Sequence, residues 1–247
     1  TVAVLGHVGG PTAPLAPIPA PAGGVVHFGG PFINDAGQAA GTWVEGGTTV
    51  RLFRWSAAEG SVDLGVGTST GLLELAGLDA YGRVYATLAD GTPGAVVWRC
   101  LRIGLVGGGP SVEDIGGAAP CRLMAVSERG VVAMLRWPDG EFRVHTWSPE
   151  AGHTLVPGLE GWSAHRVNDI NDHGHLVTRS ADGRSHAFWD GATLRPIEAA
   201  GLRIANAFAL NDRDQVVAVA TDAAFQHFAL LFEYGPELPL EDAFADL

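Results

Sequence analysis

The stretch Ile170-Asn171-Asp172-His173-Gly174, followed by His186-Ala187-Phe188-Trp189, decides the fold. An apolar residue before Asn-Asp-x-Gly indicates a strand that ends in a tight turn, because Asn, Asp and Gly tolerate the positive φ angles of such turns. The apolar-aromatic segment that follows indicates a later strand that packs in a core. This pair of motifs therefore predicts short, consecutive antiparallel strands.

The turn occurs five times along the chain. Its last position recurs at spacings of 45, 48, 44 and 40 residues, and an aromatic residue follows each turn after 15 to 18 residues. Repeats of this length, with four short strands each, are typical of β-propeller blades. We interpret the aromatic residues as packing residues. The turns end at Gly37, Gly82, Gly130, Gly174 and Asp214, and the aromatic residues are Trp55, Trp98, Trp147, Trp189 and Phe232.

We therefore predict an all-β fold, a single five-bladed β-propeller with four antiparallel strands per blade. Residues 1–10 are expected to supply a strand that closes the ring, because Thr1–Gly6 resembles Ser61–Gly65, a predicted fourth strand. The alternative is that Glu237–Leu240 fills this edge. One domain is predicted over residues 1–247, with a Pro-rich strap at 11–24, blades at about 25–68, 69–115, 116–160, 161–200 and 201–247, and a helix near 241–247.

The repeats resemble the bacterial HAF repeat, a family named after a His-Ala-Phe triplet. Ile170–Gly174 with His186–Trp189 matches its pattern best, Ile33–Gly37 with Phe53–Trp55 matches in part, and Leu5–Gly10 resembles its Leu-Gly-rich segment. The resemblance covers about residue 23 to the C-terminus, plus residues 5–10. It implies a β-propeller-type repeat and an extracellular location, and it implies little about activity.

Two repeats depart from the family pattern. Asp79 stands without the preceding Asn in the second repeat, and Ser127-Glu128 replaces Asn-Asp in the third. The Asn-Asp turns also lack the alternating acidic spacing of an EF-hand loop, so we interpret them as structural turns. His173 and His186 are likewise expected to be structural, because one lies in a turn and the other is part of the repeat itself.

The composition excludes several classes of function. The net charge of −12 argues against a nucleic-acid partner, since duplex binding requires clustered cations. The chain contains no Lys, which excludes a Schiff base and a Lys-terminated phosphate loop, and it lacks a Gly-x-Ser-x-Gly nucleophile motif. No apolar run approaches 18 residues, so a membrane partner is not expected. We expect a monomer without cofactor or metal.

Cys100 and Cys121 are too few for a disulfide framework or a zinc site in a chain of 247 residues, and we expect free, packed thiols. Location stays open. The visible chain slightly favours the cytoplasm, whereas a removed export signal would place the protein in the periplasm or outside the cell. The abundance of Arg, Ala, Gly and Pro is typical of a high-GC bacterial genome.

The inner strand of each predicted blade carries the candidate site. Positions four residues before the apolar residue of each turn include Glu74, Arg122, Arg166 and Asn206, which would line a central channel. Arginine pairs can hold a carboxylate or phosphate. The alternative is that Glu74 pairs with the arginines and plugs the channel. The predicted ligand-binding residues are Arg122, Arg166, Asn206, Asn168, His27, Met124 and Phe208.

The first functional hypothesis is binding of a small polar or anionic molecule in this channel. The second is a cofactor-free lyase, isomerase or cyclase of bacterial secondary metabolism, with Glu74 or His165 as the catalytic group that moves a proton. The third is a scaffold for protein interactions. The propeller fold hosts all three, so fold alone does not choose among them.

Overall fold

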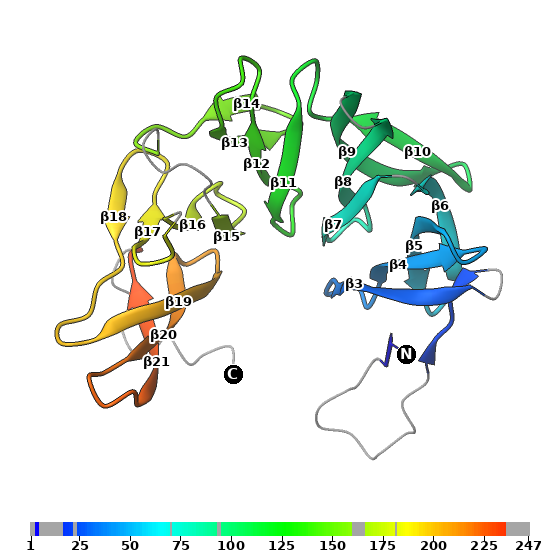
Figure 1. Ribbon diagram of the computed structural model, residues 1–247. Helices are drawn as coiled ribbons and strands as arrows, with labels where there is room; N and C mark the ends of the chain where they lie inside the picture. Colours follow the sequence, from blue (N-terminus) through cyan, green and yellow to red (C-terminus); the bar gives the residue numbers. More distant parts are fainter. Residues whose placement is uncertain are drawn as a thin grey trace. The chain divides into compact units, whose positions relative to one another are not determined.

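The computed structural model describes residues 3–4, 17–21, 24–69, 71–92, 95–159, 166–180 and 182–235 (Figure 1). These residues form strands joined by turns, and none of them lies in an α-helix. Accordingly, the described part of the chain contains no helix that could span a membrane. The predicted all-β fold is confirmed, whereas the helix predicted near residues 241–247 lies outside the described residues.

The chain divides into two compact units. The first comprises Thr1–Gly130 with Met134–Phe142, and the second comprises Val131–Ala133 with Arg143–Leu247. Each unit is built from sheets whose strands follow one another in chain order, as hairpin turns of a few residues require.

The first unit holds two complete four-stranded sheets, with orders β3-β4-β5-β6 and β10-β9-β8-β7. A short two-stranded sheet pairs β1 with β2. The strands are β1 (Ala3–Val4), β2 (Pro17–Ile18), β3 (Val25–Ile33), β4 (Ala39–Glu45), β5 (Thr49–Ser56), β6 (Gly60–Thr68), β7 (Leu72–Leu78), β8 (Val84–Thr92), β9 (Ala95–Val106) and β10 (Gly109–Asp114).

A third sheet, β11-β12-β13-β14, is divided between the two units. The second unit continues with the four-stranded sheet β15-β16-β17-β18 and the three-stranded sheet β19-β20-β21. These strands are β11 (Cys121–Val126), β12 (Val132–Arg136), β13 (Arg143–Ser148), β14 (Gly152–Leu155), β15 (Arg166–Ile170), β16 (Leu176–Arg179), β17 (His186–Trp189), β18 (Leu194–Pro196), β19 (Arg203–Leu210), β20 (Gln215–Thr221) and β21 (His227–Glu233).

Sheets of four antiparallel strands are therefore confirmed, while the number of blades and the closure of a ring stay predictions. Among the described residues, the last sheet has three strands and β21 lacks an outer neighbour. Within the predicted closing segment, Ala3–Val4 is described, and it pairs with Pro17–Ile18. The alternative closing strand at Glu237–Leu240 lies outside the described residues.

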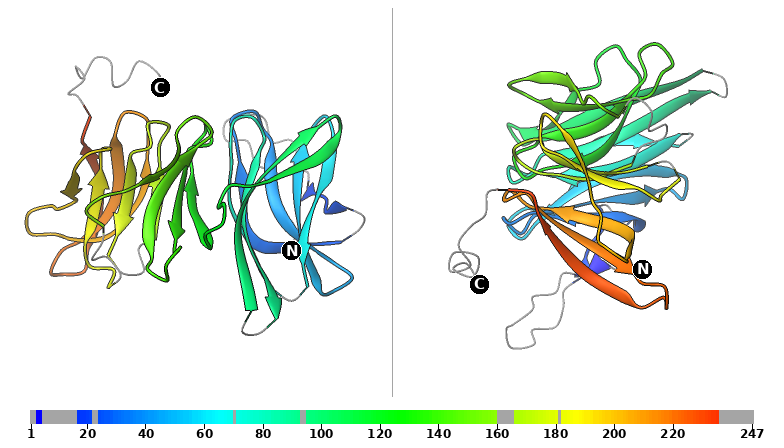
Figure 2. Two further views of the ribbon diagram at one scale, coloured as in Figure 1. Left: turned by 90° about the horizontal axis from the view of Figure 1, so that it is seen from above. Right: turned by 90° about the vertical axis from the view of Figure 1, so that its left-hand side faces the viewer.

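The core of each unit lies between successive sheets. In the second unit, β15 and β16 pack against β19 (Figure 2). Val177 and Phe188 from one sheet, with Ile197 directly after its last strand, form one buried cluster with Ile204 and Val216 from the next. Along β20 the side chains alternate between buried and exposed, as the two-residue period of a strand requires.

The repeated turn is stabilised by its second residue. The Asn171 Oδ1 atom accepts hydrogen bonds from the backbone N–H groups of His173 and His175, at 3.1 and 3.0 Å. The carboxylate of Asp79 and the amide oxygen of Asn211 accept the equivalent pairs of N–H groups in their own turns. An Asx turn of this kind explains why Asn or Asp occupies this position in four of the five repeats.

The same residue also links consecutive repeats. The Asn34 side-chain amide donates to the carbonyl oxygen of Asp79 at 2.8 Å, and that of Asn171 donates to the carbonyl oxygen of Asn211 at 3.0 Å. In both cases the acceptor is the equivalent residue of the following repeat. The turn motif therefore specifies the stacking of neighbouring sheets as well as the hairpin.

The expectation that the cysteines are free thiols is wrong. Cys100 in β9 and Cys121 in β11 form a disulfide with a Cα–Cα distance of 5.9 Å, and both are fully buried. The β10 strand and its connections bring the two residues together across 21 positions. Spacing of two cysteines in a long chain contains no information about this approach, which is set by sheet packing.

Candidate functional site

In the first unit the structure brings together two of the predicted site residues, Glu74 on β7 and Arg122 on β11. The Arg122 guanidinium forms a bidentate ion pair with the Glu74 carboxylate, with Nε–Oε2 at 2.7 Å and Nη2–Oε1 at 2.8 Å. Met124 lies further along β11 and is half-buried. His27 belongs to β3, but its side chain lies outside the described residues. Because Glu74 occupies the paired donors of Arg122, this arginine already has a carboxylate partner.

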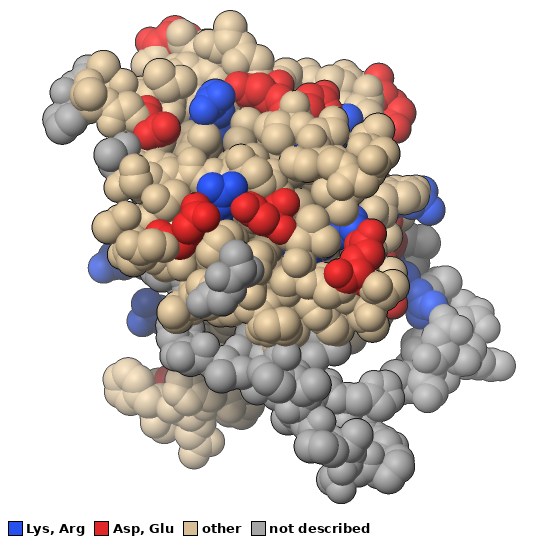
Figure 3. Space-filling model, turned by 90° about the vertical axis from the view of Figure 1, so that its right-hand side faces the viewer, with Lys and Arg blue, Asp and Glu red and all other residues tan. Residues whose placement is uncertain are grey.

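Other arginines of the first unit are also paired with carboxylates. Arg51 lies 2.7 Å from Asp63 and 3.0 Å from Glu45, and Arg102 pairs with Glu113. On the face presented in Figure 3, acidic and basic side chains accordingly lie beside one another. Pairs this exposed add little stability, but they neutralise the surface locally.

In the second unit the structure joins Asn168 on β15 to Asn206 on β19. The Asn168 side-chain amide donates to the Asn206 Oδ1 atom at 3.2 Å and to the Ala207 carbonyl oxygen. Arg166 begins β15 and is exposed, and the Phe208 side chain is 53% exposed on β19. His165 lies outside the described residues. Irregular pairing at Asn168 and on β19 interrupts the simple alternation of side chains that the sequence predicts.

A row of basic side chains crosses the fourth sheet at the end where β15 begins. Arg166 pairs directly with Arg179 on β16, and Arg179 pairs directly with His186 on β17. Residues directly opposite in an antiparallel pair share a face of the sheet, so these three side chains are neighbours. The guanidinium charges of Arg166 and Arg179 repel one another, and a bound anion would offset that repulsion.

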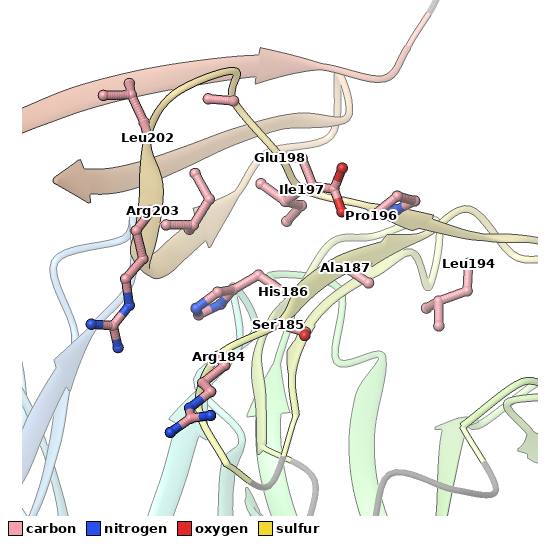
Figure 4. A pocket seen from close by; sticks show the side chains of 12 residues that line it. Arg184, Ser185, His186, Ala187, Leu194, Pro196, Ile197, Glu198, Leu202 and Arg203 are labelled. Carbon is pink, nitrogen blue, oxygen red and sulfur yellow. The ribbon is translucent and has the colours of Figure 1, made fainter. Parts of the chain in front are cut away.

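The row adjoins a hollow of about 580 Å³ that lies wholly within the second unit. Arg184, from the loop before β17, and Arg203, which begins β19, line it together with His186. Figure 4 shows these three side chains grouped at one end of the hollow, with Leu194 and Pro196 toward the other. The hollow thus combines a basic end with an apolar wall.

His186 is the most unusual group of this site. Its side chain is nearly fully buried, with 3% exposure, and neither ring nitrogen has a hydrogen-bond partner. Burial lowers its pKa below the usual 6.5, and the charge of Arg179 lowers that pKa further. A neutral imidazole in this position offers one donor and one acceptor, and leaving both unused in a buried site is costly.

The arginines of the basic row and of the hollow lack carboxylate partners within the described part of the chain. Arg166, Arg179, Arg184 and Arg203 form no ion pair there, and the buried Nε atom of Arg179 has no hydrogen-bond partner. Two carboxylates lie close by. Asp182 is fully exposed and its pKa is lowered by the Ser180 hydroxyl and, to a smaller extent, by Arg184, while Glu198 lines the hollow. Four guanidinium groups therefore outnumber the carboxylates near them.

Of these residues, the sequence predicted Arg166 as a site residue and His186 as structural, and it did not single out Arg179, Arg184 or Arg203. The hairpin register around the Ile170–Gly174 turn brings the row of basic residues to one end of the sheet. The irregular pairing between Val167 and Asp169 shifts that register by one residue. Counting residues outward from the turn therefore does not predict the pairing of Arg166 with Arg179.

One group of three described side chains could hold a metal ion. His173 and His175 in one turn and Asp214 in the next have ligand atoms that all lie within 4.8 Å of one another. His173 lies in the Ile170–Gly174 turn and His175 directly follows it, but their approach to Asp214 depends on the stacking of two repeats.

No family model and no curated protein sequence matches the chain. Among solved structures it is similar to a candidate TolB from Agrobacterium tumefaciens, at 17% identity over 85% of this chain and 79% of that chain, with a TM-score of 0.49. It is also similar to a streptogramin B lyase, at 10% identity over 85% and 68% of the two chains, with a TM-score of 0.45.

A third similar structure is the β-propeller domain of the Trilobed protease from Pyrococcus furiosus. The identity is 12% over 88% of this chain and 83% of that chain, with a TM-score of 0.38. All three TM-scores lie below 0.5. The fold is therefore argued from the strand order of this chain, and the site from its own residues.

Proposed function

We propose that this protein binds a small organic anion in the hollow of the second unit. The observation that carries the proposal is the excess of basic groups without carboxylate partners around a buried, unpartnered imidazole. Arg166, Arg184 and Arg203 are exposed, and each could give a bound anion charge-assisted hydrogen bonds.

The lining supports a carboxylate with an apolar body as the ligand class. Guanidinium groups bind carboxylates through two parallel hydrogen bonds, and the Arg184 and Arg203 side chains lie at the same end of the hollow as His186. The remaining wall includes Leu194 and Ile197, which would cover an aliphatic or aromatic group. A hollow of about 580 Å³ falls within the usual range for small-molecule sites.

The proposed site includes some of the inner-strand residues that the sequence predicts as ligand-binding. Arg166 belongs to the basic row, and Asn168 and Asn206 form a polar surface further along the same inner strands. Arg122 is a weaker candidate, because a ligand would have to displace the Glu74 carboxylate from it. A proton-transfer role for Glu74 is disfavoured for the same reason.

The proposed architecture is a five-bladed propeller of the HAF-repeat type, closed by residues 1–10. The terminal sheets support closure, since each exposes apolar side chains that a closed ring would cover. On the last sheet Phe208, Val217 and Leu231 are 53%, 45% and 58% exposed, and on the first Val25 and Ile33 are 63% and 57% exposed.

The buried Cys100–Cys121 disulfide supports an oxidising compartment, the periplasm or the exterior of the cell.

The proposed binding is testable with benzoate as the carboxylate probe and benzamide as its uncharged analogue. Saturation-transfer NMR on the full chain should detect benzoate and not benzamide. Arg184→Gln should weaken benzoate binding by about 10-fold or more, the loss expected for one charge-assisted hydrogen bond. Arg51→Gln, which removes a paired arginine in the first unit, is the matched control and should leave the affinity unchanged. Equal signals from the two probes, or equal effects of the two variants, would contradict the proposal.

A further inference from the structure

The fifth turn contains an aspartate where the four preceding turns contain glycine. Asp214 has a φ of 58°, in the left-handed region that glycine adopts most easily. Asp214 therefore carries a conformational cost that glycine would avoid, and the position of its side chain indicates a role. The four equivalent glycines have φ values between 70° and 83° and are Gly37, Gly82, Gly130 and Gly174.

The Asp214 carboxylate reaches into the preceding turn. Its Oδ1 atom lies 2.7 Å from the Nδ1 atom of His175 and accepts a hydrogen bond from the Asn171 side-chain amide at 2.8 Å. His173 lies two residues from His175, with the ring centroids 5.6 Å apart. One nitrogen from each imidazole and one carboxylate oxygen all lie within 4.8 Å of one another.

The surrounding contacts hold these three groups in place. Asn171 is 3% exposed, and its Oδ1 atom accepts the backbone N–H groups of both His173 and His175 while its amide nitrogen holds Asp214. The His175 ring also packs edge-on against Phe188 at 5.9 Å. One buried asparagine therefore fixes the backbone at both histidines and the side chain of Asp214, and the Asp214 carboxylate in turn orients the His175 ring.

We propose that His173, His175 and Asp214 bind a borderline divalent cation of the Zn²⁺ class. Two imidazole nitrogens and one carboxylate oxygen suit such ions, whereas Ca²⁺ and Mg²⁺ prefer oxygen ligands alone. In a tetrahedral zinc site neighbouring ligand atoms lie about 3.4 Å apart, so small side-chain rotations would bring the three groups together. His173 is exposed, which leaves a further coordination position open to water.

The charges nearby are favourable. Asp172 and Asp212 belong to the same two turns, and the Asp172 backbone N–H donates to the Asp212 carboxylate at 2.8 Å. Arg213 is the neighbouring cation. Its backbone N–H donates to the Asn211 Oδ1 atom, and the residue makes a further interaction. The site shares no residue with the proposed anion site, so an experiment can refute either proposal without affecting the other.

The test is titration of the full chain with Co²⁺, followed by its visible absorption, and then competition with Zn²⁺. The wild type should bind one Co²⁺ per chain in the proposed site and release it to Zn²⁺. His173→Gln should weaken binding by at least about 100-fold, because even outer-shell partners contribute 10- to 100-fold. His227→Gln, which removes an exposed histidine of β21, is the matched control and should leave the affinity unchanged.

Asp214→Gly provides a second variant that should fold, because it restores the glycine of the other turns. It should abolish the Co²⁺ absorption, while a cooperative thermal melt of the metal-free variant should show that it still folds. Absence of Co²⁺ absorption in the wild type would overturn the proposal. Retention of full affinity in both His173→Gln and Asp214→Gly, or an equal loss in His227→Gln, would overturn it as well.

Discussion

Replacing Asn171 by alanine tests whether the turn asparagine links neighbouring sheets. The substitution removes two accepted hydrogen bonds within the turn and two donated bonds to the next repeat. The donated pair, one to the Asn211 carbonyl and one to the Asp214 carboxylate, contributes about 2–4 kcal/mol, since bonds to charged groups are the stronger ones. Asn171 is 3% exposed, so water replaces these bonds only in part.

Asn211→Ala is the matched control. Asn211 accepts the same bonds within its own turn, from the N–H groups of Arg213 and Gln215, and among the described residues its side-chain amide donates to the Gln215 side chain of that turn, at 2.8 Å. Its side chain is exposed, and its loss should cost at most about 1 kcal/mol. Asn171→Ala, which loses both sets of bonds and thus about 3–5 kcal/mol, should therefore lower Tm by about 6–20 °C, and Asn211→Ala by at most about 4 °C.

The assay is thermal unfolding followed by tryptophan fluorescence, with EDTA present so that metal binding does not contribute. The difference between the two variants isolates the bonds between repeats from the bonds within the turn. Equal decreases in Tm for the two variants would refute the argument, because they would show that the interrepeat bonds add nothing to stability.

Three further predictions concern other parts of the chain. Replacing Cys100 and Cys121 together by serine should destabilise the protein by about 3 kcal/mol, the loop-entropy value for 21 residues, as measured by urea unfolding; an unchanged midpoint would contradict it. His186 binds a proton more weakly in the folded protein than in the unfolded chain, so stability should fall as the pH drops below about 6.5, and less so in His186→Gln. Deleting residues 1–10 should lower Tm by many degrees if they close the ring; an unaltered melt would disprove closure by this segment.

Most of the fold could be predicted because its determinants are local. The Asn-Asp-x-Gly turns follow from backbone conformation, and their spacing near 44 residues indicates one sheet per repeat. The disulfide could not be predicted, because the approach of Cys100 to Cys121 depends on the packing of β9 against β11. The closing strand depends likewise on contacts between parts of the chain that are distant in sequence.

The candidate site could be predicted only in outline. The inner-strand position of Arg166 follows from its distance to the turn, whereas its pairing with Arg179 depends on an irregular register after Val167. Asp214 is different, because its departure from the glycine of the other repeats was visible in the sequence. A residue that breaks a repeat at a strained position deserves a functional explanation as much as one that conserves the repeat.

The central claim is that the hollow of the second unit binds an organic carboxylate. The most direct measurement is a crystal structure of the full chain grown with 4-iodobenzoate, in which anomalous scattering locates the iodine. We predict a principal anomalous peak in the hollow near Leu194 and Ile197, with the carboxylate facing Arg184, His186 and Arg203. A principal peak beside Arg122 or elsewhere, or no bound iodobenzoate at all, would contradict it.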